Sequence, residues 1–432
     1  MTVDSSGPSV DFAHGDLRVT ADGRLLAHAD GTPFFYLGDT AWELFHRLTL
    51  AEAEDYLEDR RRKGFTVIQA AVVSEFDGLT EPNANGDLPF AEGDPARPDE
   101  GYFAAVEVII DAAARQGILI GVLPTWGDKV GPQAWGTGPE GVFHAGNARA
   151  YGRMLGERLR DRPNVIWILG GDRPADPPYL PVWREMAAGV AEGDGGRHLR
   201  TYHPVGWRSS SAWLHGETWM DFHMIQSGHG GRDQENAAFV ARDYALVPPK
   251  PTMDAEAPYE NHPINWKPEL GRFDDADVRQ AAYWAVFAGA CGHTYGCNDE
   301  RQFYTPARKP LMSGCLPWRE ALGLPGSGQM LHLRRLLESR PYLGRVPDQR
   351  VIAAGERVGA ARGDGYVLAY LPRGGAVTLR LKAAGTASWY DVRTGAWSAA
   401  GPFAAGERVF AAPSAGRGED WVLVVDGGGA AI

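Results

Sequence analysis

The sequence predicts a (β/α)8 barrel, the TIM-barrel fold, followed by a small antiparallel β-sandwich. Apolar runs typical of buried strands alternate with helical patterns eight times between residues 34 and 345. Polar residues follow nearly every one of these strands, as expected when all eight strand ends surround one site. After residue 345 the pattern changes to short runs separated by glycine-rich turns. A doubly wound open sheet is the competing fold, but it concentrates polar strand ends at one switch point, so the barrel is preferred.

Residues 1–33 are expected to form an N-terminal extension with a β-hairpin that packs on the barrel. Residues 17–20 and 24–28 are typical of short strands, and Asp22-Gly23 lies between them. Asp-Gly between two strands is a strong hairpin signal, because glycine readily adopts the positive φ that such a turn requires.

The first β/α unit begins with an apolar strand over residues 34–42, which contains Asp39 and ends at Trp42. Thr49 and Glu52 then have the spacing of a capping box, in which each side chain bonds to the other residue's backbone N–H. A helix with its apolar residues on one face is therefore expected directly after Thr49.

The other seven units repeat this alternation of strand and helix. The expected strands are residues 65–73, 118–126, 164–172, 199–203, 222–226, 250–256 and 292–297. The expected helices are residues 102–116, a segment through 151–159, then 183–191, 237–244, 277–290 and 331–337. Strands buried on both faces are continuous apolar runs, which is why they are expected in a parallel sheet. Residues 34–345 are therefore assigned to the barrel.

Residues 346–432 are expected to form the β-sandwich. Short runs at 350–353, 366–371, 377–381, 388–391, 408–410 and 421–425 are separated by turns such as Gly-Asp-Gly and Arg-Gly-Gly. Regular short strands with turns between them favour an antiparallel sandwich. Its expected role is packing against the barrel. Polysaccharide binding is the alternative, since Trp389 and Trp397 could form a binding face or a core.

Composition and charge narrow the function classes. The chain has 432 residues, of which 44% are hydrophobic and 23% charged, as in an ordinary soluble globular protein. Its net charge is −12 and no basic stripe is visible, which argues against nucleic acid and against anionic membrane surfaces. No run approaches a membrane span and no leader is visible at the N-terminus, so a cytoplasmic location is expected. The three cysteines suggest reduced thiols.

Asp172 is the first catalytic candidate. The strand over residues 164–172 ends in two glycines, and Asp172, Arg173 and Pro174 follow. An acid at the carboxyl end of a parallel strand lies where α/β barrels keep their chemistry. The alternative is that Asp172 caps the next helix or pairs only with Arg173.

Glu256 is the second catalytic candidate, because it ends the seventh strand. The fourth and seventh strand ends face each other across a barrel mouth, where two carboxylates can flank one glycosidic bond. One of them would protonate the leaving oxygen, and the other would attack or stabilise the anomeric carbon. Adjacent strand residues point to opposite sides, and a bulge could change which of them faces the barrel mouth, so Asp254 stays open as the partner, as does Glu260.

Further polar and aromatic residues at the strand ends are expected to bind the sugar. Carboxylates, amides, imidazoles and phenols bond to hydroxyl groups, and indole faces stack on sugar rings. The expected substrate-binding residues are Asp39, Trp42, Gln69, Trp126, Arg173, His203, Gln226, Tyr259, His293 and Tyr295. As a set they favour a carbohydrate substrate.

Neither a metal nor another cofactor is expected. His203, His223, His229 and His262 raise the alternative of a metal-dependent hydrolase, but no pair of them has the close spacing of a helical zinc motif. A second alternative is a non-catalytic carbohydrate-binding or adhesion protein that uses the C-terminal sandwich.

Five segments resemble the motifs of a known family. They are residues 34–46, 64–69, 167–173, 253–260 and 292–296. These segments are similar to the apiosidase-like glycoside hydrolases, which are barrels with a C-terminal sandwich named as a collagen-binding domain. The resemblance extends from about residue 17 to the C-terminus.

This resemblance implies a retaining hydrolase that removes a terminal sugar, apiose or a similar pentose, from an oligosaccharide or glycoside. By the same resemblance, Asp172 would be the acid/base and Glu256 the nucleophile. The characterised members act on plant pectin and are exported, whereas no leader is visible here. The resemblance therefore bears on the chemistry more than on a polymeric substrate.

Overall fold

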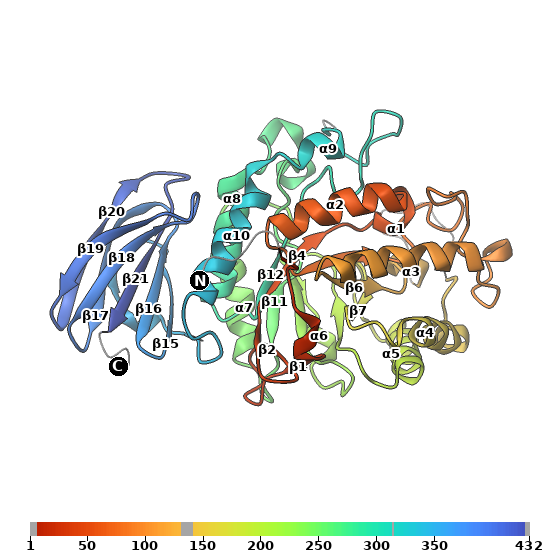
Figure 1. The fold of residues 1–432 in the computed structure, drawn as a ribbon, viewed down its shortest axis with the longest axis horizontal. Coiled ribbons are helices and arrows are strands. Elements are labelled where there is room, and N and C mark those ends of the chain that lie inside the picture. The colour runs from red at the N-terminus through yellow and green to blue at the C-terminus, as the bar shows by residue number, and fades with distance from the viewer. Residues whose placement is uncertain (1–6, 131–140, 313–314, 428–432) are drawn as a thin grey trace.

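The structure is a computed structural model that describes residues 7–130, 141–312 and 315–427. Its larger part is a barrel of parallel strands surrounded by helices, and its smaller part is an antiparallel sandwich beside it (Figure 1). The barrel strands are β4 (Tyr36–Thr40), β5 (Val67–Ala71), β6 (Leu119–Leu123), β7 (Val165–Gly170), β8 (Arg200–His203), β10 (His223–Gln226), β11 (Thr252–Asp254) and β12 (Gly292–Tyr295).

The barrel strands lie in one curled sheet in the order β8-β7-β6-β5-β4-β12-β11-β10, and β9 (Arg208–Ser209) pairs antiparallel with β10. The two ends of this sheet meet. The backbone N–H of Asp221 donates to the Arg200 carbonyl at 2.9 Å, and the Thr201 hydroxyl donates to the Phe222 carbonyl at 2.7 Å. All eight expected strands are present, so the predicted barrel is confirmed.

Helices cover the outside of the barrel (Figure 1). They are α1 (Leu44–Arg47), α2 (Leu50–Arg62), α3 (Glu100–Arg115), α4 (Ala145–Leu159), α5 (Leu180–Asp194), α6 (Ser211–Leu214), α7 (Asn236–Tyr244), α8 (Asp275–Phe287), α9 (Trp318–Ala321) and α10 (Pro325–Glu338). The expected capping box is formed at the start of α2, where Thr49 accepts from the Glu52 N–H and Glu52 accepts from the Thr49 N–H. The short helices α1, α6 and α9 were not expected from the sequence.

The N-terminal segment forms a three-stranded antiparallel sheet rather than a simple hairpin. Its strands are β1 (Leu17–Val19), β2 (Leu26–His28) and β3 (Pro33–Phe34). Leu17, Leu26 and Phe34 are buried in the same apolar core as the barrel residues, so this sheet packs on the barrel. The first six residues of the expected extension lie outside the described part of the chain.

The C-terminal sandwich consists of two antiparallel sheets. Its strands are β13 (Val346–Pro347), β14 (Ile352–Ala354), β15 (Gly359–Gly363), β16 (Tyr366–Leu371), β17 (Gly374–Leu381), β18 (Gly385–Asp391), β19 (Trp397–Phe403), β20 (Gly406–Ala415) and β21 (Trp421–Gly427). Six strands form the sheet β13-β15-β16-β21-β18-β19, and three form the sheet β14-β17-β20. Trp389 is buried in the sandwich core, whereas Trp397 is 46% exposed.

Helices α8 and α10 lie on the side of the barrel that faces the sandwich (Figure 1). Tyr283 of α8 stacks on Tyr370 of β16 with ring centroids 4.9 Å apart. Arg279 of α8 forms an ion pair with Asp420 at 2.8 Å, and both side chains are almost fully buried. The two parts therefore share a packed interface. Among the described residues, no helix combines the length and apolar character that crossing a bilayer requires.

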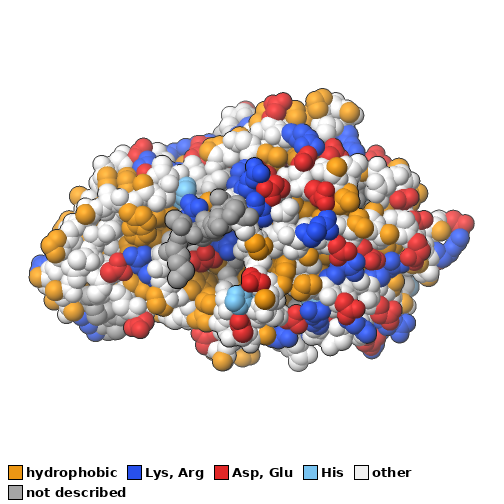
Figure 2. Space-filling view, in the orientation of Figure 1, with side chains coloured by type: hydrophobic (Ala, Val, Ile, Leu, Met, Phe, Trp, Pro, Cys, Tyr) orange, Lys and Arg blue, Asp and Glu red, His pale blue; other side chains and the backbone are white. Residues whose placement is uncertain are grey.

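Acidic and basic side chains are interspersed over the face of the molecule shown in Figure 2, which carries no broad basic patch. This distribution agrees with the sequence, in which the net charge of −12 arises without a basic stripe.

Candidate active site

The end of β7 turns sharply to bring Asp172 over the barrel mouth. Gly170 and Gly171 have φ of 92° and 108°, and Asp172 itself has φ of 54°. A Cβ at Gly170 would lie 2.4 Å from the His203 carbonyl oxygen, and one at Gly171 would lie 2.9 Å from the Trp126 ring. Only glycine combines this backbone conformation with such close approach. The two glycines therefore let the buried strand end in a carboxylate that lines a cavity.

Glu256 follows β11 by two residues and is 4% exposed. Both of its carboxylate oxygens have an imidazole partner. His203 Nε2 lies 3.0 Å from Oε2, and His229 Nε2 lies 3.1 Å from Oε1. His203 ends β8, whereas His229 belongs to the loop after β10, so two other segments converge on Glu256.

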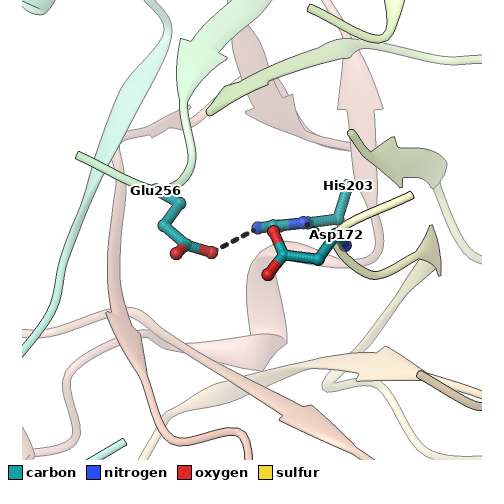
Figure 3. Close-up of side chains that lie close together, drawn as sticks. All are labelled: Asp172, His203 and Glu256. Atoms are coloured by element: carbon teal, nitrogen blue, oxygen red, sulfur yellow. Dashed lines mark hydrogen bonds and ion pairs between the residues drawn. The ribbon is translucent and has the colours of Figure 1, made fainter. Parts of the chain in front are cut away.

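Figure 3 shows His203 in contact with Glu256, with the Asp172 side chain close by. His203 Nδ1 accepts a long hydrogen bond, 3.5 Å, from the backbone N–H of Asp172. If Nδ1 accepts, the proton of a neutral imidazole lies on Nε2, which faces Glu256. One oxygen of Asp172, one of Glu256 and one nitrogen of His203 all lie within 4.8 Å of one another.

The two carboxyl groups have opposite pKa shifts. Burial, and then the negative charge of Glu256, raise the pKa of Asp172 to about 6, against the opposing effects of His203, Gln226 and Arg173. For Glu256, burial also favours the neutral form, but the contacts with His203 and His229 outweigh it and hold the pKa below its usual range. Below about pH 6 the site therefore contains an ionised Glu256 beside a protonated Asp172.

A cavity of about 710 Å³ opens over these acids. This volume is typical of a small-molecule site. The cavity is lined by Trp42, Glu75, Phe76, Trp126, Asp172, Val205, Gly206, Trp207, Gln226, Gly228, His229, Glu256, Tyr259, His262, Trp266, Arg301, Leu311 and Met312.

Aromatic rings form the inner wall of the cavity. The Trp42 and Trp126 rings are 4.8 Å apart, and the Trp42 ring meets His203 edge-on at 5.1 Å. The Trp42 indole N–H donates to the Tyr259 hydroxyl at 3.1 Å. Because Trp42, Trp126 and Tyr259 are each at most 3% exposed, neighbouring side chains fix the rings that face the acids.

The structure brings together some of the residues that the sequence nominated. Asp172, Glu256, Trp42, Trp126, Gln226 and Tyr259 line the cavity. His203 does not line it but contacts Glu256. Asp39, Gln69, Arg173, His293 and Tyr295 are also outside its lining.

Asp39 lies beneath the site in a buried charge network. It forms an ion pair with Arg60 of α2 and accepts a hydrogen bond from the Tyr56 hydroxyl, both at 2.5 Å. Arg60 also pairs with the buried Glu300. The structure therefore gives Asp39 partners that link β4 to α2, in place of the expected sugar hydroxyl.

Three other nominated residues also have contacts below or beside the cavity. Gln69 Nε2 donates to the Ala255 carbonyl at 3.2 Å, next to Glu256, and to the Thr294 hydroxyl. The Tyr295 hydroxyl donates to Glu260 at 2.6 Å. His293 is fully buried, and burial lowers its pKa to about 3, so it is neutral.

Arg173 reaches Asp172 through the backbone. Its Nη1 donates to the Asp172 carbonyl oxygen at 2.9 Å. This geometry leaves the Asp172 carboxyl able to keep its raised pKa.

The two alternative acids are occupied elsewhere. Asp254 is fully buried and accepts hydrogen bonds from the Ser227 hydroxyl at 2.7 Å and the Asn236 amide at 2.8 Å. Glu260 accepts from Tyr295 and from the Gly326 N–H at 3.2 Å. Neither of these two acids lines the cavity.

Several lining residues had no sequence signal strong enough to nominate them. Glu75, Trp207, Trp266 and Arg301 lie in loops several residues beyond a strand end. Glu75 adds a third acid to the cavity, and burial together with the charge of Asp172 raises its pKa well above the usual value. Asp172 and Glu256 were found because they lie at the end of a predicted strand. These four residues lie farther from a strand end, so the same criterion did not select them.

Comparisons with known proteins agree with this architecture. A family model described as "Apiosidase-like, catalytic domain" matches residues 20–344. A second, described as "Putative collagen-binding domain of a collagenase", matches residues 346–426. No curated protein matches the chain.

Two solved structures are similar over nearly the whole chain. One, named "Glycoside hydrolase", is 35% identical with a TM-score of 0.89 and covers 98% of this chain and 99% of that one. The other, a glycoside hydrolase family 5 protein from Bacteroides vulgatus ATCC 8482, is 34% identical with a TM-score of 0.90 and covers 98% and 95% of the two chains. The resemblance inferred from the motifs is thus confirmed, and the chain belongs to the apiosidase-like glycoside hydrolases.

Proposed function

We propose that this protein is a retaining glycosidase that removes a terminal sugar by double displacement. Asp172 is the acid/base and Glu256 the nucleophile. The observation that carries the proposal is one cavity with two carboxyl groups of opposite pKa shift, whose nearest oxygens lie within 4.8 Å. Retaining enzymes need about 5–5.5 Å between the carboxyl groups, whereas inverting enzymes need about 6.5–9.5 Å to admit a water.

In the first step, a Glu256 carboxylate oxygen attacks the anomeric carbon while the bond to the leaving oxygen breaks. The proton of Asp172 passes to that oxygen, so the aglycone departs as an alcohol and Asp172 becomes a carboxylate. In the second step, this carboxylate takes a proton from water as the water attacks the anomeric carbon. The bond to Glu256 breaks as the water attacks, so Glu256 leaves as a carboxylate and Asp172 is protonated again.

The two imidazoles suit the nucleophile role of Glu256. Contacts from His203 and His229 favour its ionised form, which is the form that attacks. The same contacts hold its two oxygens in fixed positions, so little reorganisation is required at the moment of reaction.

The cavity also suggests how the substrate lies. Trp42 and Trp126 wall the region beside the acids, where the terminal sugar would bind. Trp207 and Trp266 line the same cavity but are 44% and 49% exposed, with ring centroids 6.4 Å apart. Exposed indoles at the rim suit an aglycone that carries a ring. We therefore propose an oligosaccharide or aryl glycoside substrate, with apiose or a similar pentose as its terminal sugar.

The test is a screen of 4-nitrophenyl glycosides of apiose, arabinofuranose, galactose, xylose and rhamnose. Product configuration is then followed by NMR on the substrate that turns over. The first-formed sugar should keep the configuration of the substrate. An inverted first product would overturn the double-displacement mechanism and the nucleophile role of Glu256.

A metal-dependent hydrolase is the second candidate, because Asp172, His203 and Glu256 offer three ligand atoms within 4.8 Å of one another. Metal analysis of the purified protein, with activity measured before and after chelation, separates the two. Stoichiometric metal together with chelator-sensitive turnover would favour this candidate. Full turnover after chelation would favour direct attack by Glu256.

A further inference from the structure

The loop between β10 and α7, residues 227–235, connects the active site to the C-terminal sandwich. Its start contributes Gly228 and His229 to the cavity lining, and His229 contacts Glu256 at 3.1 Å. Its later part contains Asp233, which contacts the sandwich. One short loop thus contacts both the proposed nucleophile and a part of the protein outside the barrel.

The two ends of the loop are attached to the same buried group. Ser227 and Asn236 both donate to the Asp254 carboxylate, at 2.7 and 2.8 Å. This carboxylate is fully buried at the end of β11. The ends of the loop are therefore fixed by the barrel, and the position of its middle depends on other contacts.

Three side chains converge on Asp233. Arg373 donates to Oδ2 at 2.9 Å, Arg357 donates to the Asp233 carbonyl at 2.9 Å, and Gln280 of α8 donates to Oδ1 at 2.7 Å. Arg357 and Arg373 belong to turns of the sandwich, between β14 and β15 and between β16 and β17. Both the backbone and the carboxylate of Asp233 are thus held from the sandwich side.

Contacts with Trp284 of α8 hold Arg357 in place. Its guanidinium lies 4.4 Å from the centre of the Trp284 ring, and the Trp284 indole N–H donates to the Arg357 carbonyl at 3.3 Å. Arg357 and Asp233 both have positive φ, 54° and 56°. Non-glycine residues keep such conformations where the surrounding contacts compensate for the strain.

On its active-site side the loop also contacts the barrel: the Gly228 N–H donates to the Glu256 carbonyl at 3.0 Å, and the His229 ring lies 4.4 Å from Tyr259 and from His262. The His229 carbonyl accepts from the Asn265 N–H at 2.8 Å, and Arg232 donates to the Arg272 carbonyl at 2.6 Å. Both partners belong to the neighbouring loop after β11, which is also at the surface. We propose that the C-terminal sandwich is a positioning element for the active site: Arg357 and Arg373 hold the far part of the 227–235 loop by Asp233 and thereby support the barrel contacts that keep His229 against Glu256.

This role goes beyond the proposed function and assigns a task to the sandwich that requires no ligand. The contacts at Asp233 are partly exposed, so each is worth little alone, but they act on one residue together with Gln280. Removing both guanidinium groups should therefore loosen the loop without unfolding the barrel.

The test is hydrogen exchange of the full-length Arg357→Ala/Arg373→Ala variant. The matched control is Arg340→Ala, which removes a two-point ion pair with Asp426 between the same two parts but contacts neither the loop nor α8. Amides of residues 228–235 should exchange about fivefold faster in the double variant and unchanged in the control. Equal exchange in both variants, or no change in either, would overturn the proposal.

Two further measurements separate positioning from general destabilisation. If the double variant does not fold, Arg373→Gln carries the same test, and Arg373→Lys should restore protection. In active protein, loosening His229 should raise the pKa of Glu256, so the acid limb of kcat/KM should move to higher pH in the double variant and not in Arg340→Ala. Absence of turnover would count against the proposed function, whereas hydrogen exchange would still decide the role of the sandwich.

Discussion

Asp172 and Glu256 are both carboxylic acids in one cavity, but their different surroundings favour different protonation states. Glu256 has two imidazole partners, whereas Arg173 donates to the backbone carbonyl of Asp172. The negative charge of Glu256 adds to burial in keeping a proton on Asp172. Pairs of titratable groups whose environments separate their pKa values are the pattern expected of an acid and a nucleophile.

Replacing Glu256 should change the titration of Asp172. In Glu256→Gln the neighbouring negative charge is gone, so the pKa of Asp172 should fall from about 6 towards its usual range. NMR of the 13C-labelled aspartate carboxyl measures this directly. Glu260→Gln is the control, because it removes a buried acid that does not line the cavity while leaving Glu256 in place. An unchanged pKa in Glu256→Gln would contradict the coupling.

Activity should depend on pH in a way that follows from these shifts. Asp172 must hold its proton to act as an acid, and its raised pKa means that the proton is lost as pH rises through about 6. The value of kcat/KM should therefore fall above this pH, while the acid limb lies well below it because Glu256 stays ionised. In His229→Ala the acid limb should move upward, since one of the contacts that favour ionised Glu256 is lost. A pH profile of both proteins tests the pair of shifts.

Removing each acid should leave a different residual reaction. Asp172→Ala should still form the glycosyl-enzyme from substrates with good phenolate leaving groups and then stall, losing about 10²–10⁴-fold in turnover. Azide needs no base, so it should rescue this variant with retained configuration. Azide should rescue Glu256→Ala with inverted configuration, because it replaces the nucleophile. NMR of the azide products reads the outcome, and the opposite pair of configurations would exchange the two roles.

The strands and long helices of the barrel could be predicted from the sequence, because a buried parallel strand is a continuous apolar run and a surface helix has a clear apolar face. The four-residue helices α1 and α6 carry too little periodicity to be recognised. Residues at strand ends were nominated by position alone. Position at a strand end identified Asp172 and Glu256, which line the cavity. The same criterion also selected Asp39, whose side chain instead forms an ion pair beneath the cavity.

The elements below the site depend on a buried cation. Arg60 of α2 is fully buried between Asp39 of β4 and Glu300, which follows β12. Arg60→Met should destabilise the protein by about 3–5 kcal/mol, because it leaves two carboxylates buried without their partner. Urea denaturation measures this cost. Arg62→Met is the control on the same helix, since its pair with Glu58 is exposed and should contribute about 0–1 kcal/mol. If both variants lost the same free energy of unfolding, the buried ion pairs of Arg60 would contribute no more to stability than an exposed pair.

An apolar cluster that contains residues of both parts joins the barrel to the sandwich. A single cluster of buried residues includes Tyr283 and Phe287 of α8 together with Leu368 and Tyr370 of β16. Removing residues 346–432 would expose this face of α8 to water, so a truncated barrel is a poor test of what the sandwich does. Substitutions that keep both parts are more informative.

Asp420→Asn should lower the stability of both parts together. Asp420 pairs with the buried Arg279 at 2.8 Å and accepts a hydrogen bond from the Tyr370 hydroxyl at 3.1 Å. Loss of its charge leaves Arg279 with Asp275 as its remaining carboxylate, and the expected cost is about 3 kcal/mol. Arg340→Ala breaks a partly exposed ion pair with Asp426 at the same interface and should cost about 0–1 kcal/mol.

Pulsed thiol labelling of the buried Cys291 follows the barrel during urea denaturation, and hydrogen exchange of β21 follows the sandwich. Because Asp420 joins a sandwich loop to a barrel helix through a shared core, both probes should move to lower urea by the same amount in Asp420→Asn. If β21 opened at lower urea while Cys291 stayed protected as in the parent protein, the two parts would unfold independently. The interface would then be too weak for the sandwich to hold an active-site loop.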